Sequence, residues 1–223
     1  MGRFGVDDAD NYGGSGGSSF FALKNDGDVA RVRFMYNGAT DIEGYAVHEV
    51  TIGDKHRYVN CLRSYNEPKS KCPFCEANNF QRAKLYIPVY DIEEEEVKIW
   101  ERGKNYFQKM SSLCARYSSA DKPLVSHIFE VERHGKKGDT STQYETYEVG
   151  CDDTTLEDLP EAPNVLGTII LDKTAEEMRE FLDTGSFPSG ELSNNSRRES
   201  RETREEQSQP TGRRTPSRRS NEF

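Results

Sequence analysis

Cys72-Pro73-Phe74-Cys75 is the segment whose residue types and spacing point most directly to chemistry. Two thiolates two residues apart can bind one tetrahedral metal ion from a single tight turn. A third thiol, Cys61, stands eleven residues before Cys72, ahead of the polar segment 63–71. A redox pair would need a thioredoxin-like βαβ setting, and unrelated core thiols would need an apolar segment. The sequence offers neither, so the spacing predicts a structural zinc ion with three cysteine ligands.

The fourth ligand should be a histidine, and spacing alone leaves two candidates. His56 is nearer to Cys61, whereas His48 lies across a predicted turn at 53–54, from where a strand side chain can point toward Cys61. Three cysteines and one histidine complete a tetrahedral zinc and leave no position for water. The sequence contains no HExxH or paired-carboxylate motif. We therefore expect a structural ion and no enzyme activity.

The elements that must position these residues are mainly β-strands. Apolar alternation predicts strands at 30–36, 45–52, 56–62, 85–90, 97–102, 129–133 and 144–149. Helical spacing and capping signals predict helices at 73–82, 104–117 and 174–183. Short strands with a helix in mid-chain favour an α+β fold that is mainly β, built as a small closed OB-type barrel with a zinc-binding insertion.

Composition divides the chain into four parts. Only 33% of the residues are hydrophobic and the mean hydropathy is −0.89, so the folded core should be shorter than the 223-residue chain. Segments 1–18 and 190–223 are rich in polar residues and are predicted to be disordered. Between them we expect a zinc-containing domain at 19–151 and an acidic segment with a short helix at 152–189.

The net charge of −9 is distributed unevenly along the chain. Residues 29–151 hold 18 basic and 18 acidic residues, whereas residues 152–189 hold two basic and ten acidic ones. A neutral domain can still present a basic groove if its charges are segregated. There is no apolar run near 18 residues and no secretory signal. We therefore expect a soluble, intracellular protein with reduced thiols and no membrane association.

The predicted strands carry cations and flat rings, the combination that binds single-stranded nucleic acid without sequence preference. Alternation in 97–102 places Val97 and Ile99 inward and Lys98, Trp100 and Arg102 outward. Strand tyrosines and a lone tryptophan also pack in cores, so a packing role stays open for each ring. The expected DNA-contacting residues are Arg31, Arg33, Arg57, Lys84, Tyr86, Tyr90, Lys98, Trp100 and Arg102.

A resemblance to a known family covers roughly residues 20–150. His48 to Cys61, then ten residues, then Cys72-Pro-Phe-Cys75, resembles the zinc segment of the T-even phage helix-destabilising single-stranded-DNA-binding protein family. Segment 30–35 resembles the family's first barrel strand, and 97–110 resembles its aromatic-basic strand, glycine turn and following helix. The resemblance implies a zinc-containing OB fold and favours His48 over His56.

The resemblance also implies a function. Such a protein would coat and protect single-stranded DNA in phage DNA replication, recombination and repair, in the cytoplasm of the infected bacterial host. Replication or recombination proteins would dock on the acidic segment or the tail. The sequence departs from the family in its Cys61–Cys72 gap, one residue longer, and in lacking a basic N-terminal motif and an acidic tail. Cooperative binding is therefore not implied. RNA as ligand, or a zinc-knuckle interaction module in phage transcription, are the alternatives.

Overall fold

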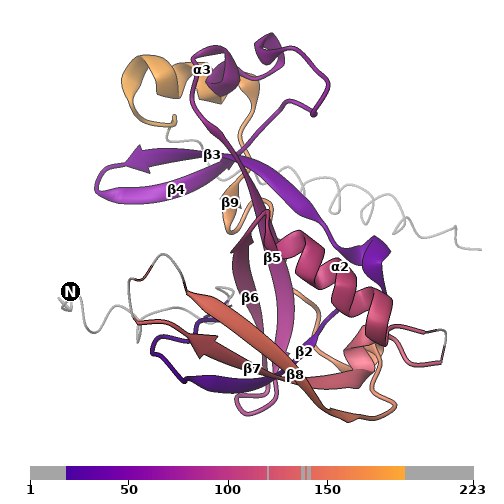
Figure 1. Cartoon of the computed structure of the whole chain (residues 1–223). Coiled ribbons are helices and arrows are strands. Elements are labelled where there is room, and N and C mark those ends of the chain that lie inside the picture. Colours follow the sequence, from indigo (N-terminus) through magenta and orange to yellow (C-terminus); the bar gives the residue numbers. More distant parts are fainter. Residues whose placement is uncertain (1–18, 120, 137–138, 140–141, 189–223) are drawn as a thin grey trace, which may run out of the picture. The chain divides into compact units, whose positions relative to one another are not determined.

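The computed structural model describes residues 19–119, 121–136, 139 and 142–188 (Figure 1). The segments predicted to be disordered, 1–18 and 190–223, lie outside these residues. Within the described part of the chain, the strands form one nine-stranded mixed sheet accompanied by three α-helices. This confirms the mainly β, α+β class. None of the helices in these ranges is long and apolar enough to cross a membrane.

The elements follow one another with short connections. The strands are β1 (Ser19–Phe20), β2 (Val29–Phe34), β3 (Gly44–Ile52), β4 (Lys55–Asn60), β5 (Gln81–Asp91), β6 (Glu96–Gly103), β7 (His127–His134), β8 (Gln143–Cys151) and β9 (Ile170–Leu171). The α-helices are α1 (Pro73–Glu76), α2 (Tyr106–Tyr117) and α3 (Ala175–Thr184).

The sheet branches at β5. The main path runs β8-β7-β2-β5-β3-β4-β9, and β6 pairs with both β5 and β1. The first half of β5 pairs with β3, its last three residues pair with β2, and β6 pairs along most of its length. In the described residues β8 and β9 each pair with a single strand, so the sheet does not close into the expected OB-type barrel.

Local sequence signals explain most element ends. The β3–β4 hairpin turns at Gly53, whose φ of 60° suits a glycine, as predicted. The side chain of Thr174 accepts a hydrogen bond from the backbone N–H of Glu177, and Gly185 ends α3 in the left-handed region, which confirms that helix. The helix expected over 73–82 is wrong in extent. It stops at Glu76 because Asn78 takes a left-handed φ of 59° and the chain then enters β5.

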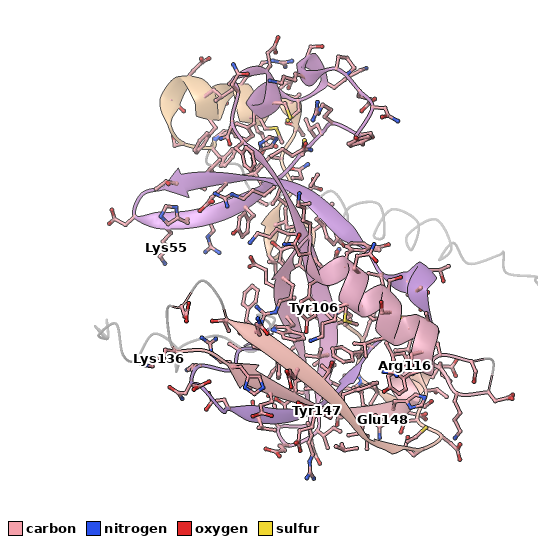
Figure 2. All side chains as sticks on the ribbon, viewed as in Figure 1. Lys55, Tyr106, Arg116, Lys136, Tyr147 and Glu148 are labelled. Carbon is pink, nitrogen blue, oxygen red and sulfur yellow. The ribbon has the colours of Figure 1, made fainter. Side chains whose placement is uncertain are left out.

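Trp100 lies at the centre of the main core, with 1% of its surface exposed. Its ring makes edge contacts with Phe21, Tyr106 and Tyr144 at centroid distances of 5.5, 5.0 and 5.2 Å. The expected outward orientation of Trp100 is therefore wrong. Figure 2 shows Tyr106 at the start of α2, where the helix lies against the sheet.

Lys98 is also buried, and its ammonium pairs with Asp91 at 2.8 Å and Glu94 at 2.6 Å. Its predicted outward, DNA-facing position is therefore wrong as well. A buried ammonium is tolerated only with such partners. Here one of them, Asp91, is buried beside it.

A second apolar layer covers the other face of β5 and β6. Tyr86 and Ile99 pack there against Val165 and Ile170, which come from the acidic segment that follows β8. Tyr86 is buried, which corrects its predicted DNA-facing position, and burial raises the pKa of its hydroxyl. Strands covered on both faces lose the polar–apolar alternation that marks a solvent face. This is why alternation misplaced the side chains of β6.

Arg33 fixes the start of the acidic segment to the sheet. Its guanidinium donates to Asp152 at 3.1 and 2.5 Å, and to the carbonyls of Val125 and Ser126 at 3.2 and 3.0 Å. The Arg33 side chain is buried, so the expected DNA contact by Arg33 is wrong. The Arg33 guanidinium holds the pKa of Asp152 at about 2, below its ordinary 3.8.

Asp152→Asn should lower the free energy of unfolding by about 1–2 kcal/mol, because it leaves a buried guanidinium without its counter-charge. The expected loss is modest because the Asp152 carboxylate is half exposed and screened by solvent. A carboxyl group whose pKa is lower in the folded state than in the unfolded state stabilises the fold at pH values above its unfolded-state pKa. The difference between wild type and variant should therefore shrink as pH falls from about 4 toward about 2.

Chemical denaturation at several pH values measures this difference. Asp153→Asn is the matched control, because the neighbouring carboxylate is 97% exposed and, among the described residues, forms an ion pair only with the surface residue Lys122. An equal loss of unfolding free energy in the Asp152→Asn and Asp153→Asn variants would show that the Arg33–Asp152 ion pair stabilises the fold no more than an exposed surface pair does.

Candidate metal centre and basic groove

Strand register places His48 and Cys61 on one face of the β3–β4 hairpin. His48 lies opposite Val59, and the backbone N–H of Cys61 donates to the carbonyl of Ala46 at 2.9 Å. Cross-strand partners share a face and faces alternate along a strand, so His48 and Cys61 point the same way. His56 is five residues before Cys61 and therefore points to the opposite face, with its side chain 74% exposed.

The other two thiols come from a tight turn. Cys72 caps the N-terminus of α1 and Cys75 lies within it, and Pro73 suits the first helical position. Burial would raise the pKa of Cys72, but the backbone N–H groups around its sulfur stabilise the thiolate, so the net shift lowers the pKa. Asn79 N–H donates to the Phe74 carbonyl at 2.8 Å and closes the turn. The segment therefore presents both sulfurs toward the hairpin.

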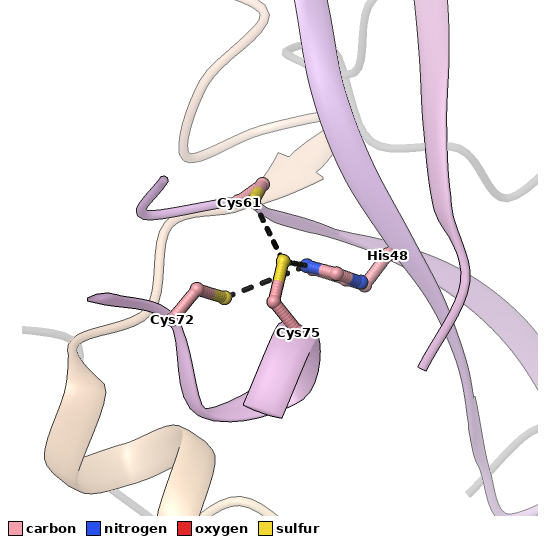
Figure 3. Close-up of side chains that lie close together, drawn as sticks. All are labelled: His48, Cys61, Cys72 and Cys75. Carbon is pink, nitrogen blue, oxygen red and sulfur yellow. Dashed lines mark hydrogen bonds between the residues drawn. The ribbon is translucent and has the colours of Figure 1, made fainter. Parts of the chain in front are cut away.

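The four predicted ligands converge in a small volume (Figure 3). Their ligand atoms all lie within 4.8 Å of one another. The Cys61 and Cys75 sulfurs are 3.6 Å apart, and His48 Nε2 lies 3.4 Å from Cys72 Sγ and 3.5 Å from Cys75 Sγ. A tetrahedral zinc would separate two sulfurs by about 3.8 Å and a sulfur from a nitrogen by about 3.6 Å. The cluster could therefore hold one metal ion.

Electrostatics favours a cation at the centre of the cluster. Burial and the neighbouring Cys61 and Cys72 sulfurs raise the pKa of Cys75 to about 12. Three thiolates this close repel one another unless a positive charge lies between them. Burial lowers the pKa of His48, so its imidazole is neutral near pH 7 and offers the Nε2 lone pair.

Aromatic packing supports the cluster from behind. The Phe74 ring is buried, 5.5 Å from the His48 ring and 5.8 Å from Phe181 of α3. The side-chain amide of Gln81 donates to the Cys61 sulfur at 3.1 Å. Such outer contacts orient metal ligands. Part of the acidic segment, α3, thus belongs to the support of the metal centre.

A groove of about 980 Å³ adjoins the metal centre. Among the described residues, four cationic side chains line it and no aspartate or glutamate does. Its walls come from the segment after Cys61, from the start of β5, and from the junction of β6 with α2. The lining residues are Ala46, Arg63, Ser64, Tyr65, Phe80, Gln81, Arg82, Ala83, Lys84, Gly103, Lys104, Asn105, Tyr106 and Thr142.

Two aromatic rings in this groove are open to solvent. Tyr65 is 94% exposed and Phe80 is 75% exposed. The Arg82 guanidinium lies 5.9 Å from the Phe80 ring. Lys84 is paired with Glu101 at 2.5 Å, and this contact raises the Lys84 pKa despite burial. The groove therefore combines fixed cations with free ring faces.

Of the nine residues expected to contact DNA, only Lys84 lines the groove. Arg102 lies just behind it, its guanidinium 4.3 Å from the Trp100 ring and 4.0 Å from the Tyr144 ring. Three more of the nine residues, Arg31, Arg57 and Tyr90, lie outside both the core and the groove, on β2, β4 and β5 respectively. Arg31 and Arg57 are exposed, and Tyr90 is half-buried.

Sequence reasoning missed five of the groove residues, which are Arg63, Tyr65, Phe80, Arg82 and Lys104. One signal could have found the rings. Tyr65 and Phe80 each stand in a polar stretch, outside any apolar pattern that would bury them. An aromatic residue that stands close to cationic residues in such a stretch is a candidate for stacking on unpaired bases.

His48→Gln should remove the metal, because three thiols cannot complete the tetrahedral set. We expect a loss on the order of 4 kcal/mol in the free energy of unfolding. His56→Gln is the matched control and should keep both metal content and melting temperature. Elemental analysis of the purified variants and thermal unfolding measure the two effects. Equal metal content in both variants would remove His48 from the ligand set.

The chain matches no protein-family model, and no curated protein is significantly similar to it in sequence. The functional argument therefore depends on two features of the chain itself. One is a cluster of one histidine and three cysteines that could hold a metal ion. The other is an open, basic groove beside it.

Proposed function

We propose that this protein binds single-stranded DNA without sequence preference and carries one structural zinc ion. The observation that carries the proposal is the lining of the groove. Within the part of the chain that the structure describes, this lining has four cations and no carboxylate, on a chain whose net charge is −9. Such segregation concentrates positive potential where a phosphate backbone would lie. The groove binds through charge and shape and needs no catalytic group.

Exposed rings favour a single strand over a duplex. In a duplex the bases stack on one another and their faces are covered. Tyr65 and Phe80 present free ring faces beside the cations of Arg63 and Arg82. Unpaired bases can stack on such rings while the phosphates contact the cations, and each stacked base contributes about 1–3 kcal/mol. Because every base has a flat face, this mode is tolerant of sequence.

The metal ion would affect DNA binding indirectly, by fixing the position of the segments that form the groove wall. Arg63 and Tyr65 follow Cys61 by two and four residues, and Phe80 follows Cys75 by five. An ion bound to both cysteines would fix the ends of the segments that carry these side chains. Three thiolates and one imidazole suit zinc, and their closed set suits a structural role. Part of the zinc-binding free energy would then contribute to folding.

The resemblance to the T-even phage helix-destabilising family gives the proposal a biological setting. The protein would coat and protect single strands during phage DNA replication, recombination and repair in the infected bacterial cytoplasm. Other phage replication or recombination proteins would dock on the acidic segment or the C-terminal tail. The Asp and Glu side chains of 152–189 that are exposed in the structure are available for such contacts.

Affinity for oligo-dT should exceed affinity for a duplex of the same length and fall with salt. With four phosphate contacts, the slope of log K against log salt should be about −3 for a single strand. Fluorescence anisotropy with labelled single-stranded DNA, duplex and RNA at several salt concentrations measures both quantities. Preference for the duplex, or salt-independent binding, would refute the proposal, and a preference for RNA would reassign the ligand.

Phe80→Ala and Tyr65→Ala should each weaken oligo-dT binding by about 1–3 kcal/mol, because each removes a stacking face. The fold should be unaffected, since both rings are exposed. Tyr147→Ala is the matched control, because Tyr147 is exposed on β8 and does not line the groove. If the Tyr147 variant loses as much affinity as the other two, stacking in the groove is not the binding mode.

A further inference from the structure

A second cluster of chemically active side chains lies at the far end of the β7–β8 pair from the groove. It consists of His127, Glu148 and Cys151, whose ligand atoms lie within 4.8 Å of one another. Figure 2 shows Glu148 near one end of this strand pair and Lys136 near the other. None of the three residues lines the groove or joins the metal centre.

A β-bulge creates this cluster. His127 pairs with Cys151 and Ile128 with Gly150, but Phe129 then pairs with Glu148, so Val149 is an extra residue in β8. In an unbroken register Glu148 would lie opposite Glu130, on the other face of the sheet. The bulge turns Glu148 onto the face that carries His127 and Cys151. Bulges that redirect a side chain in this way occur frequently next to functional sites.

The three side chains form an ordered chain of contacts. His127 Nδ1 lies 2.8 Å from Glu148 Oε1, and His127 Nε2 lies 3.9 Å from Cys151 Sγ. A carboxylate at Nδ1 holds the proton on that nitrogen and leaves the Nε2 lone pair facing the thiol. The Tyr117 ring, 5.5 Å from the imidazole, helps to hold its orientation. This is the arrangement of an activated nucleophile, a base and an orienting group.

The same geometry argues against a metal site. The carboxylate oxygen and the sulfur contact opposite nitrogens of one imidazole ring. A single ion can bind only one of those nitrogens, so it could not use all three residues as they lie. The arrangement fits proton transfer from sulfur to nitrogen better than shared ligation.

Cys151 is also the accessible thiol of this chain. Among the five cysteines, all of which lie in described residues, it alone is exposed. Burial raises the pKa of Cys114 to about 11, and the other three belong to the metal cluster. Near Cys151, the Lys122 ammonium donates to the Asp152 carbonyl at 2.8 Å and pairs with the Asp153 carboxylate. The charged groups around the thiol are therefore the Lys122 ammonium and the carboxylates of Glu148, Asp152 and Asp153.

We propose that Cys151 is a reactive thiol, activated by His127 and Glu148, and that it exchanges with low-molecular-mass disulfides. The Cys151 proton passes to His127 Nε2, and the thiolate attacks one sulfur of the disulfide. The new S–S bond forms as the old one breaks, and the leaving thiolate takes the proton back from His127. Cys151 becomes a mixed disulfide, and half of the reagent leaves as a thiol. A second disulfide exchange with a free thiol reverses the modification.

The test uses the full-length, zinc-loaded protein and 2,2′-dithiodipyridine, whose released thiopyridone is followed by absorbance. We expect a fast phase of one thiol that Cys151→Ser removes. His127→Gln should slow this phase by about tenfold or more, as loss of a positioned base does, and should move its pH dependence upward. Glu148→Gln should slow it less. Glu130→Gln is the matched control, because it neutralises a carboxylate on the other face of the same strands and should leave the rate unchanged.

Circular dichroism of each variant checks that the fold is retained, and Glu148→Gln keeps the test valid if His127→Gln unfolds. The proposal is overturned if Cys151 reacts no faster than N-acetylcysteine at the same pH. It is equally overturned if folded His127→Gln and Glu148→Gln variants keep the wild-type rate. Protection of Cys151 by micromolar Zn²⁺, beyond the first bound equivalent, would assign the cluster to metal binding instead.

Discussion

The backbone pairing of β5 is the constraint on which the rest of the structure depends. One end of this strand pairs with β3, which carries His48, and the other end pairs with β2 in the main core. β6 pairs with β5 across both regions. Any shift in the register of β5 would therefore move the metal ligands, the core around Trp100 and the groove wall together. Its first residues, Gln81 to Lys84, are also groove residues.

The metal centre and the acidic segment 152–189 pack against each other. Phe74 lies between the His48 ring and Phe181 of α3, so the helix covers the turn that presents Cys72 and Cys75. β9 pairs with β4 in parallel and adds a strand beside the ligand-bearing hairpin. A small cluster of ligands at the edge of a sheet has little core of its own. The residues of α3 and β9 supply the buried apolar contacts that the cysteine-bearing segment lacks.

Local thiol spacing was sufficient to predict Cys61, Cys72 and Cys75 as ligands, but it left His48 and His56 open, and only the family resemblance favoured His48. The hairpin register in the structure decides between them, because strand parity places His48 on the face of Cys61 and His56 on the opposite face. The orientation of β6 could not be read in this way, because Val165 and Ile170 cover its second face from more than sixty residues away. Trp100 and Lys98 were therefore placed outward in error. The His127–Glu148–Cys151 cluster was equally inaccessible, since one extra residue in β8 decides which face Glu148 occupies.

The ion pairs beside the groove explain how an acidic chain can hold a basic surface. Arg82 is 3.0 Å from Glu49, and Lys84 is 2.5 Å from Glu101, yet neither glutamate lines the groove. These carboxylates restrain the cations without lining the groove themselves. A phosphate would meet cations whose side-chain entropy is already partly lost, which favours binding. It would also meet cations already partly neutralised, which weakens binding. The Arg82–Glu49 pair is partly exposed and contributes little by itself, so for this cation the first effect can outweigh the second. The net charge of the chain is therefore a poor guide to the charge of the groove.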